Sequence, residues 1–148
     1  MFSNFFKSSK PAKKNTSQLR WEAEYDEDDD LVYDQEVVGE SFYQDNLLQI
    51  AGEKTDESKE VECTALLVPE PENKHDRNAV AVYINNLKVG HLSRDDAADY
   101  QEFLQEFNIT GKSVECAAFI TGGWDRGERG EGDFSVRLST EYPWELTE

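Results

Sequence analysis

The sequence has little of the chemistry that metal sites and most enzymes need, with two cysteines and two histidines in 148 residues. Cys63 and Cys116 lie far apart and have no neighbouring Cys or His, so we predict no zinc site and two half-buried strand thiols in a reducing compartment. The chain also contains no GxSxG, no phosphate-binding glycine loop and no HExxH. We therefore expect no enzymatic activity, no metal and no cofactor.

Long apolar runs are missing too. No stretch reaches the roughly eighteen apolar residues that a membrane-spanning helix requires. The lysines near the start are not followed by the apolar segment of a signal peptide. The sequence therefore predicts a soluble, cytoplasmic protein without a membrane partner.

Positive charge is scarce, since 15 Lys and Arg face 32 Asp and Glu for a net charge of −17. This acidity excludes a broad basic surface for nucleic acid, because phosphates would be repelled. The charge is zoned: residues 1–20 carry +5, residues 21–36 carry −9 and residues 37–148 carry −13. We predict a disordered basic tail over 1–20, an acidic linker over 21–36, a folded domain over 37–140 and a C-terminal tail over 141–148.

Hydrophobic patterning within the folded part predicts a mainly β (α+β) domain. Asn85 and Asn86 suit a two-residue hairpin turn, Ser93 suits a helix N-cap, and Gly39 suggests a bulge within the first strand. The predicted strands are 35–43, 61–68, 79–84, 87–92, 114–120 and 134–138, and the predicted helices are 44–50 and 94–107. A glycine-rich loop over 121–133 is expected to be mobile. About six strands and two helices predict a small, partly open β-barrel.

Three segments of this domain together resemble the HIRAN domain. They are VVGESFY at 37–43, PENKHDRNAVAV at 71–82 and VGHL at 89–92, and the resemblance extends over about 37–138. HIRAN domains occur at the front of SWI/SNF-type fork-remodelling ATPases and as free-standing small proteins. The resemblance implies an OB-like six-stranded β-barrel with two helices, which captures the 3′-hydroxyl end of single-stranded DNA in repair or replication.

The resemblance also implies a set of nucleic-acid-binding residues. An aromatic pair in the first strand holds the terminal nucleotide, a carboxylate accepts a hydrogen bond from the 3′-hydroxyl, basic residues approach phosphates, and a final-strand aromatic stacks on a base. The matching positions are Phe42, Tyr43, His75, Asp76, His91, Arg94 and Phe134. Aromatic faces stack on any base, and a carboxylate prefers a hydroxyl to a 3′-phosphate. Ser41 stands where the DNA-binding members have an arginine.

Several positions in these segments also have a structural interpretation, whereas Tyr43 and Arg94 are not needed to explain the local fold. Asn73 and Asp76 suit turn caps, Phe42 suits a core position and His91 suits an ordinary strand position. Trp124, in the glycine-rich loop, is a candidate either for a partner contact or for packing over a barrel end.

The acidity leaves a second function open. In this alternative, an acidic protein-interaction or regulatory module has lost DNA affinity, and residues 21–36 mimic a nucleic-acid backbone toward a basic protein. A helicase or a nuclease is a candidate partner under either function.

Overall fold

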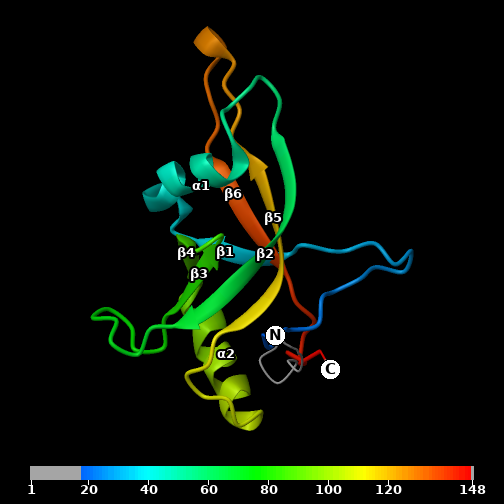
Figure 1. The fold of residues 1–148 in the computed structure, drawn as a ribbon, viewed down its shortest axis with the longest axis vertical. Helices are drawn as coiled ribbons and strands as arrows, with labels where there is room; N and C mark the ends of the chain where they lie inside the picture. The colour runs from blue at the N-terminus through cyan, green and yellow to red at the C-terminus, as the bar shows by residue number, and fades with distance from the viewer. Residues whose placement is uncertain (1–17, 148) are drawn as a thin grey trace, which may run out of the picture.

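The computed structural model describes residues 18–147 and contains a closed barrel of six antiparallel strands (Figure 1). The barrel order is β1-β4-β3-β2-β5-β6, and β6 pairs with β1 to close it. Helices α1 and α2 lie at opposite ends of the barrel. The elements are β1 Gln35–Val38, α1 Gln44–Ala51, β2 Lys59–Pro69, β3 Val80–Ile84, β4 Leu87–Leu92, α2 Arg94–Glu106, β5 Val114–Gly122 and β6 Phe134–Ser139. The small six-stranded barrel with two helices is confirmed, although it is closed rather than partly open.

The glycine of the VGHL segment allows β1 to close over β4. Val38 of β1 is the strand partner of His91, which follows Gly90. A Cβ atom at Gly90 would lie 2.6 Å from Val37 Cγ1 and 2.7 Å from the Val38 carbonyl oxygen. Only a residue without a side chain leaves room for this approach, so Gly90 serves barrel closure.

The predicted first strand, 35–43, is shorter than expected. β1 ends at Val38, Gly39 takes a left-handed conformation with φ 79°, and a 3₁₀-helix, η2 (Glu40–Tyr43), follows. The Glu40 carboxylate accepts a hydrogen bond from Val136 N at 3.1 Å, so a side chain occupies a β6 donor just beyond the last β1–β6 pair, Glu36 with Arg137. Gly39 therefore ends the strand rather than bulging it, and the aromatic pair lies on a helical turn.

The β3–β4 hairpin and α2 follow the sequence prediction. Asn85 and Asn86 have φ values of 52° and 65°, as a two-residue hairpin turn requires. The Ser93 hydroxyl accepts a hydrogen bond from Asp96 N at 3.2 Å and caps α2. The buried side of α2 carries Ala97, Tyr100 and Leu104 at helical spacing.

The segments predicted as an acidic linker and a C-terminal tail both pack onto the barrel. Trp21 and Trp144 are buried, and their rings lie 5.4 Å apart, centroid to centroid. Both rings contact Tyr100 of α2 edge-on, and Trp21 Nε1 donates a hydrogen bond to the Tyr100 hydroxyl at 3.1 Å. The folded unit therefore extends beyond residues 37–140 on both sides. The predicted disorder of the basic tail falls mostly on residues 1–17, which lie outside the described residues.

The glycine-rich loop extends the β5–β6 hairpin instead of forming an open loop. Asp125 pairs with Glu131, and Asp125 N donates to the Thr55 carbonyl at 2.7 Å. The Trp124 ring leaves no room for a Cβ atom on Gly132, and the Arg126 guanidinium lies 4.1 Å from the ring centroid. Trp124 therefore packs within the hairpin.

Candidate nucleic-acid interface

The aromatic turn η2 is held from both of its ends. At the first residue of the turn, the Glu40 carboxylate accepts from Val136 N of β6. Directly after the turn, the Gln44 side chain accepts from Phe134 N at 2.8 Å and donates to the Phe134 carbonyl at 3.0 Å. These anchors fix the backbone while the residues between them face outward. Phe42 is 85% exposed, which excludes a core role, and Tyr43 is half-buried. An exposed aromatic ring on a rigid turn is suited to stacking on a flat ligand.

The loop between β2 and β3 is shaped by two Asx turns. Asn73 Oδ1 accepts from His75 N at 2.9 Å and from Asp76 N at 3.1 Å, and Asp76 Oδ1 accepts from Asn78 N at 2.9 Å. The turn-capping interpretation of Asn73 and Asp76 is therefore confirmed. Asp76 Oδ2 lies 3.9 Å from Arg94 Nε, too far for a hydrogen bond, so this oxygen retains acceptor capacity.

Helix α2 holds this loop against the barrel. Arg94 Nη2 donates to the His75 carbonyl at 3.1 Å, and Gln101 Nε2 donates to the Asn78 carbonyl at 3.1 Å. The Arg94 side chain is nevertheless 74% exposed. His75, Asp76 and Arg94, three of the predicted site residues, are thus brought together by the Ser93-capped start of α2.

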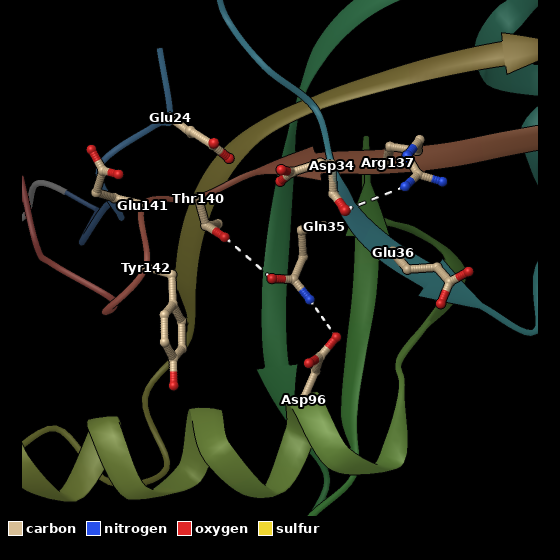
Figure 2. Close-up of a pocket in the computed structure, with 9 residues that line it drawn as sticks. All are labelled: Glu24, Asp34, Gln35, Glu36, Asp96, Arg137, Thr140, Glu141 and Tyr142. Carbon is tan, nitrogen blue, oxygen red and sulfur yellow. Dashed lines mark hydrogen bonds between the residues drawn. The ribbon is translucent and has the colours of Figure 1, made fainter. Parts of the chain in front are cut away.

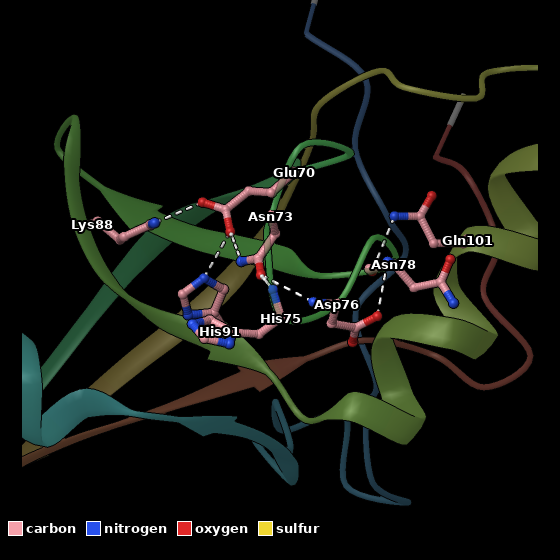
Figure 3. Close-up of polar contacts among 8 residues, drawn as sticks. All are labelled: Glu70, Asn73, His75, Asp76, Asn78, Lys88, His91 and Gln101. Atoms are coloured by element: carbon pink, nitrogen blue, oxygen red, sulfur yellow. Dashed lines mark hydrogen bonds and ion pairs between the residues drawn. The ribbon is translucent and has the colours of Figure 1, made fainter.

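Glu70 is the hub of a polar network beside the loop (Figure 3). Its carboxylate accepts from Lys88 Nζ at 2.6 Å, from Asn73 Nδ2 at 3.0 Å and from His91 Nε2 at 2.9 Å, which assigns the proton to this histidine nitrogen. Burial alone would raise the pKa of Glu70, but the hydrogen bonds from Lys88, Asn73 and His91 outweigh burial and lower that pKa to about 2. Glu70 is therefore ionised at neutral pH and holds three donors in place.

A bulge in β4 places Lys88 and His91 on one face. Val82 pairs with Gly90 and Tyr83 with Lys88, so Val89 has no partner on β3. Without this extra residue, side chains three positions apart would point to opposite faces of the strand. Because of the bulge, both side chains reach the same Glu70 carboxylate.

The network and the aromatic turn enclose a shallow cavity of about 550 Å³. Its lining residues are Tyr43, Glu70, Pro71, Glu72, Asn73, Lys88 and His91. Tyr43 and His91 were predicted from the sequence, whereas Glu70 and Lys88 were not. Lys88 Nζ lies 6.0 Å from the Tyr43 ring centroid, at the outer limit of a cation–π contact. The cavity thus combines an aromatic face with cationic donors.

Phe134 lies apart from this set. Only 2% of its surface is exposed, and Lys54 Nζ lies 5.7 Å from its ring centroid. Phe134 lines a different cavity together with Gln44 and Lys54. The predicted stacking of a base on Phe134 does not fit this structure, because the residue is part of the core.

A second hollow, of about 560 Å³, is strongly acidic (Figure 2). Five carboxylates line it together with one cation, Arg137, and they belong to Glu24, Asp34, Glu36, Asp96 and Glu141. A hydrogen bond with Asp34 raises the pKa of Glu24, and burial and the charges of Asp34 and Glu141 raise this pKa further. This hollow repels phosphates. Within residues 18–147, no three His, Cys, Asp or Glu side chains are arranged to hold a metal ion.

The closed barrel and the cavity beside the aromatic turn together define a small β-barrel binding module. The HIRAN domain profile matches residues 32–121, which is more than half of the chain, and the chain belongs to the HIRAN domain family. HIRAN domains are generally non-catalytic modules that bind nucleic acid. The matched range includes every predicted site residue except Phe134. Comparisons with curated proteins and with solved structures gave no match. Across residues 18–147, no helix has the length and apolarity needed to cross a membrane.

Proposed function

We propose that this protein captures the 3′-hydroxyl end of single-stranded DNA without catalysing a reaction on it. The observation that carries the proposal is the position of Asp76. Its carboxylate is fixed through Oδ1, keeps Oδ2 as a free acceptor and is still 20% exposed. A fixed carboxylate accepts from a hydroxyl and repels a phosphate monoester, so it selects ends that carry a free 3′-hydroxyl.

The other residues have complementary roles in this proposal. Phe42 stacks on a base and Tyr43 forms one wall of the cavity. Arg94 contacts a phosphate, and His91, whose ring is oriented by Glu70, lies near the phosphates without donating to them. We place this activity in DNA repair or replication, alongside a helicase or a nuclease.

The test is a fluorescence anisotropy titration with matched short oligonucleotides that end in a 3′-hydroxyl or a 3′-phosphate. The wild-type protein is expected to prefer the hydroxyl end, and Asp76→Asn is expected to lose most of this preference. Phe42→Ala is expected to weaken binding to both ends by about 1–3 kcal/mol, the value of one base stack. Tyr142→Ala is the matched control, because Tyr142 is another exposed aromatic and lies at the acidic hollow. Equal affinity for the two ends, or no binding at low salt, would contradict the proposal.

The acidic hollow favours a second candidate function, the docking of a basic protein segment. Five carboxylates beside the exposed ring of Tyr142 are complementary to lysine and arginine side chains. An oligo-lysine peptide is the probe. Neutralising Glu36 and Glu141 with glutamine is expected to weaken its binding, whereas Phe42→Ala is not. An unchanged peptide affinity in the glutamine variant argues against this function.

A further inference from the structure

Lys88 is a cation in the cavity to which neither the sequence motifs nor the family match assigns a role. Its side chain is 25% exposed, and its backbone is fixed because Asn46 Nδ2 of α1 donates to the Lys88 carbonyl at 2.8 Å. The Lys88 ammonium group therefore has a defined position beside Tyr43, whereas the ammonium group of an ordinary surface lysine moves freely on its side chain.

The hydrogen bonds of Lys88 leave part of its donor capacity unused. An ammonium has three N–H donors, and Glu70 Oε2 accepts one of them at 2.6 Å. Among the described residues, no second acceptor is hydrogen-bonded to Lys88 Nζ. Burial lowers the pKa of Lys88, but the hydrogen bond and the charge of Glu70 outweigh it and raise that pKa, so the ammonium stays charged. Two charged donors thus remain available to a ligand in the cavity.

The carboxylates of the cavity do not prevent an anion from binding there. Glu70 already accepts hydrogen bonds from Lys88, Asn73 and His91, and the Lys88 ammonium offsets its charge locally. Glu72, the other carboxylate of the lining, is exposed to solvent, where water and salt screen its charge.

We propose that Lys88 binds a phosphate of the captured strand at a linkage inside the 3′ end, an inference that rests on the proposed function. Lys88 and Asp76 lie on opposite sides of His91 in Figure 3. A strand whose terminal hydroxyl reaches Asp76 therefore passes His91 before its backbone reaches Lys88. The phosphate bound by Lys88 therefore belongs to an internal linkage of the strand and not to the linkage of the terminal nucleotide.

The experiment is a scan with single neutral linkages. Short oligo(dT) strands with a 3′-hydroxyl carry one methylphosphonate at each of the linkages nearest the 3′ end in turn. Binding to wild-type protein is expected to weaken by about tenfold at one internal linkage, the effect of losing one charge-assisted hydrogen bond. Lys88→Gln is expected to bind the unmodified strand about tenfold more weakly and to be insensitive to methylphosphonate at that same linkage. For Lys88→Gln, the slope of log K against log [salt] is expected to be shallower than the wild-type slope by about 0.7.

Two further variants serve as controls. Lys88→Arg keeps the cation and is expected to remain sensitive to methylphosphonate at the same linkage. This variant also keeps the inference testable if Lys88→Gln does not fold. Lys112→Gln makes the same change of charge at an exposed position beyond α2 and is expected to match the wild type. Wild-type binding without a sensitive internal linkage, or Lys88→Gln matching Lys112→Gln, overturns this inference alone. Failure of the wild-type protein to bind the unmodified strand overturns both the inference and the proposed function.

Discussion

Replacing Glu70 by glutamine removes the charge that holds three donors of the candidate site. In the folded protein the pKa of Glu70 is about 2, against the usual 4.5. At about 1.4 kcal/mol per pH unit, this difference corresponds to roughly 3 kcal/mol. Because 21% of the side chain stays open to solvent, water screens part of this interaction. We therefore expect Glu70→Gln to lower the free energy of unfolding by about 1–2 kcal/mol at pH 7.

The loss of stability in Glu70→Gln has a characteristic pH dependence. The folded pKa of Glu70 lies below its unfolded value, so the carboxylate stabilises the fold fully above about pH 4.5 and loses this effect as the pH falls toward 2. The stability difference between wild type and Glu70→Gln is thus expected to shrink across this window. All other carboxylates are common to both proteins and cancel in the difference.

Urea unfolding followed by tryptophan fluorescence is the assay, because urea is uncharged and does not screen the ion pair. Low protein concentration is needed, since the sequence pI of about 4.4 falls within the window. Glu72→Gln, an exposed neighbour in the same loop, is the matched control and is expected to change stability by less than about 0.5 kcal/mol. A stability difference for Glu70→Gln that stays constant from pH 7 to the acid end of the window would refute the reasoning.

Three other substitutions test the fold and the acidic hollow by the same unfolding assay. Gly90→Ala forces a Cβ atom against the Val38 carbonyl and is expected to cost about 1–3 kcal/mol; an unchanged stability would show that β1 and β4 separate easily. Trp144→Ala empties a buried site beside α2 and is expected to cost about 3–5 kcal/mol, whereas a negligible loss would mean that the C-terminal segment is not part of the core. Glu24→Gln is expected to stabilise the protein slightly at pH 7, because the hydrogen bond with Asp34 raises the pKa of Glu24 above its unfolded value; this gain should vanish as the pH falls through about 4.5, and a destabilised variant would contradict it.

The elements that could be predicted from the sequence carry their signals locally. The Asn85-Asn86 turn follows from two adjacent residues that tolerate positive φ, and α2 follows from the Ser93 cap with apolar residues at helical spacing. Local signals also located Asn73 and Asp76 in an Asx-turn loop. In each case the residues that determine the conformation lie within a few positions of one another.

The features that sequence reasoning missed depend on contacts between distant segments. Trp21 stands among nine acids in the segment 21–36, so charge counting placed it in a linker, yet it packs against Tyr100 and Trp144. The Lys88–Glu70 contact depends on a bulge opposite Val82 and Tyr83, which no local pattern indicates. The end of β1 at Val38 is likewise followed by a distant contact, that of the Glu40 carboxylate with β6.

The distribution of charge explains how an acidic protein can belong to a family that binds nucleic acid. The acidic hollow is formed by the segment before β1, by β1, β6 and the start of α2, so phosphates are repelled on that side. The cations of the candidate site, Lys88 and Arg94, lie at the rim formed by β4 and the loop held by α2. Lys74 and Arg77 are exposed in the same loop, whereas the protein as a whole has a net charge of −17. Under the proposed function, the favourable contacts are therefore expected with the few nucleotides that reach these cations, because the rest of the strand meets an acidic protein.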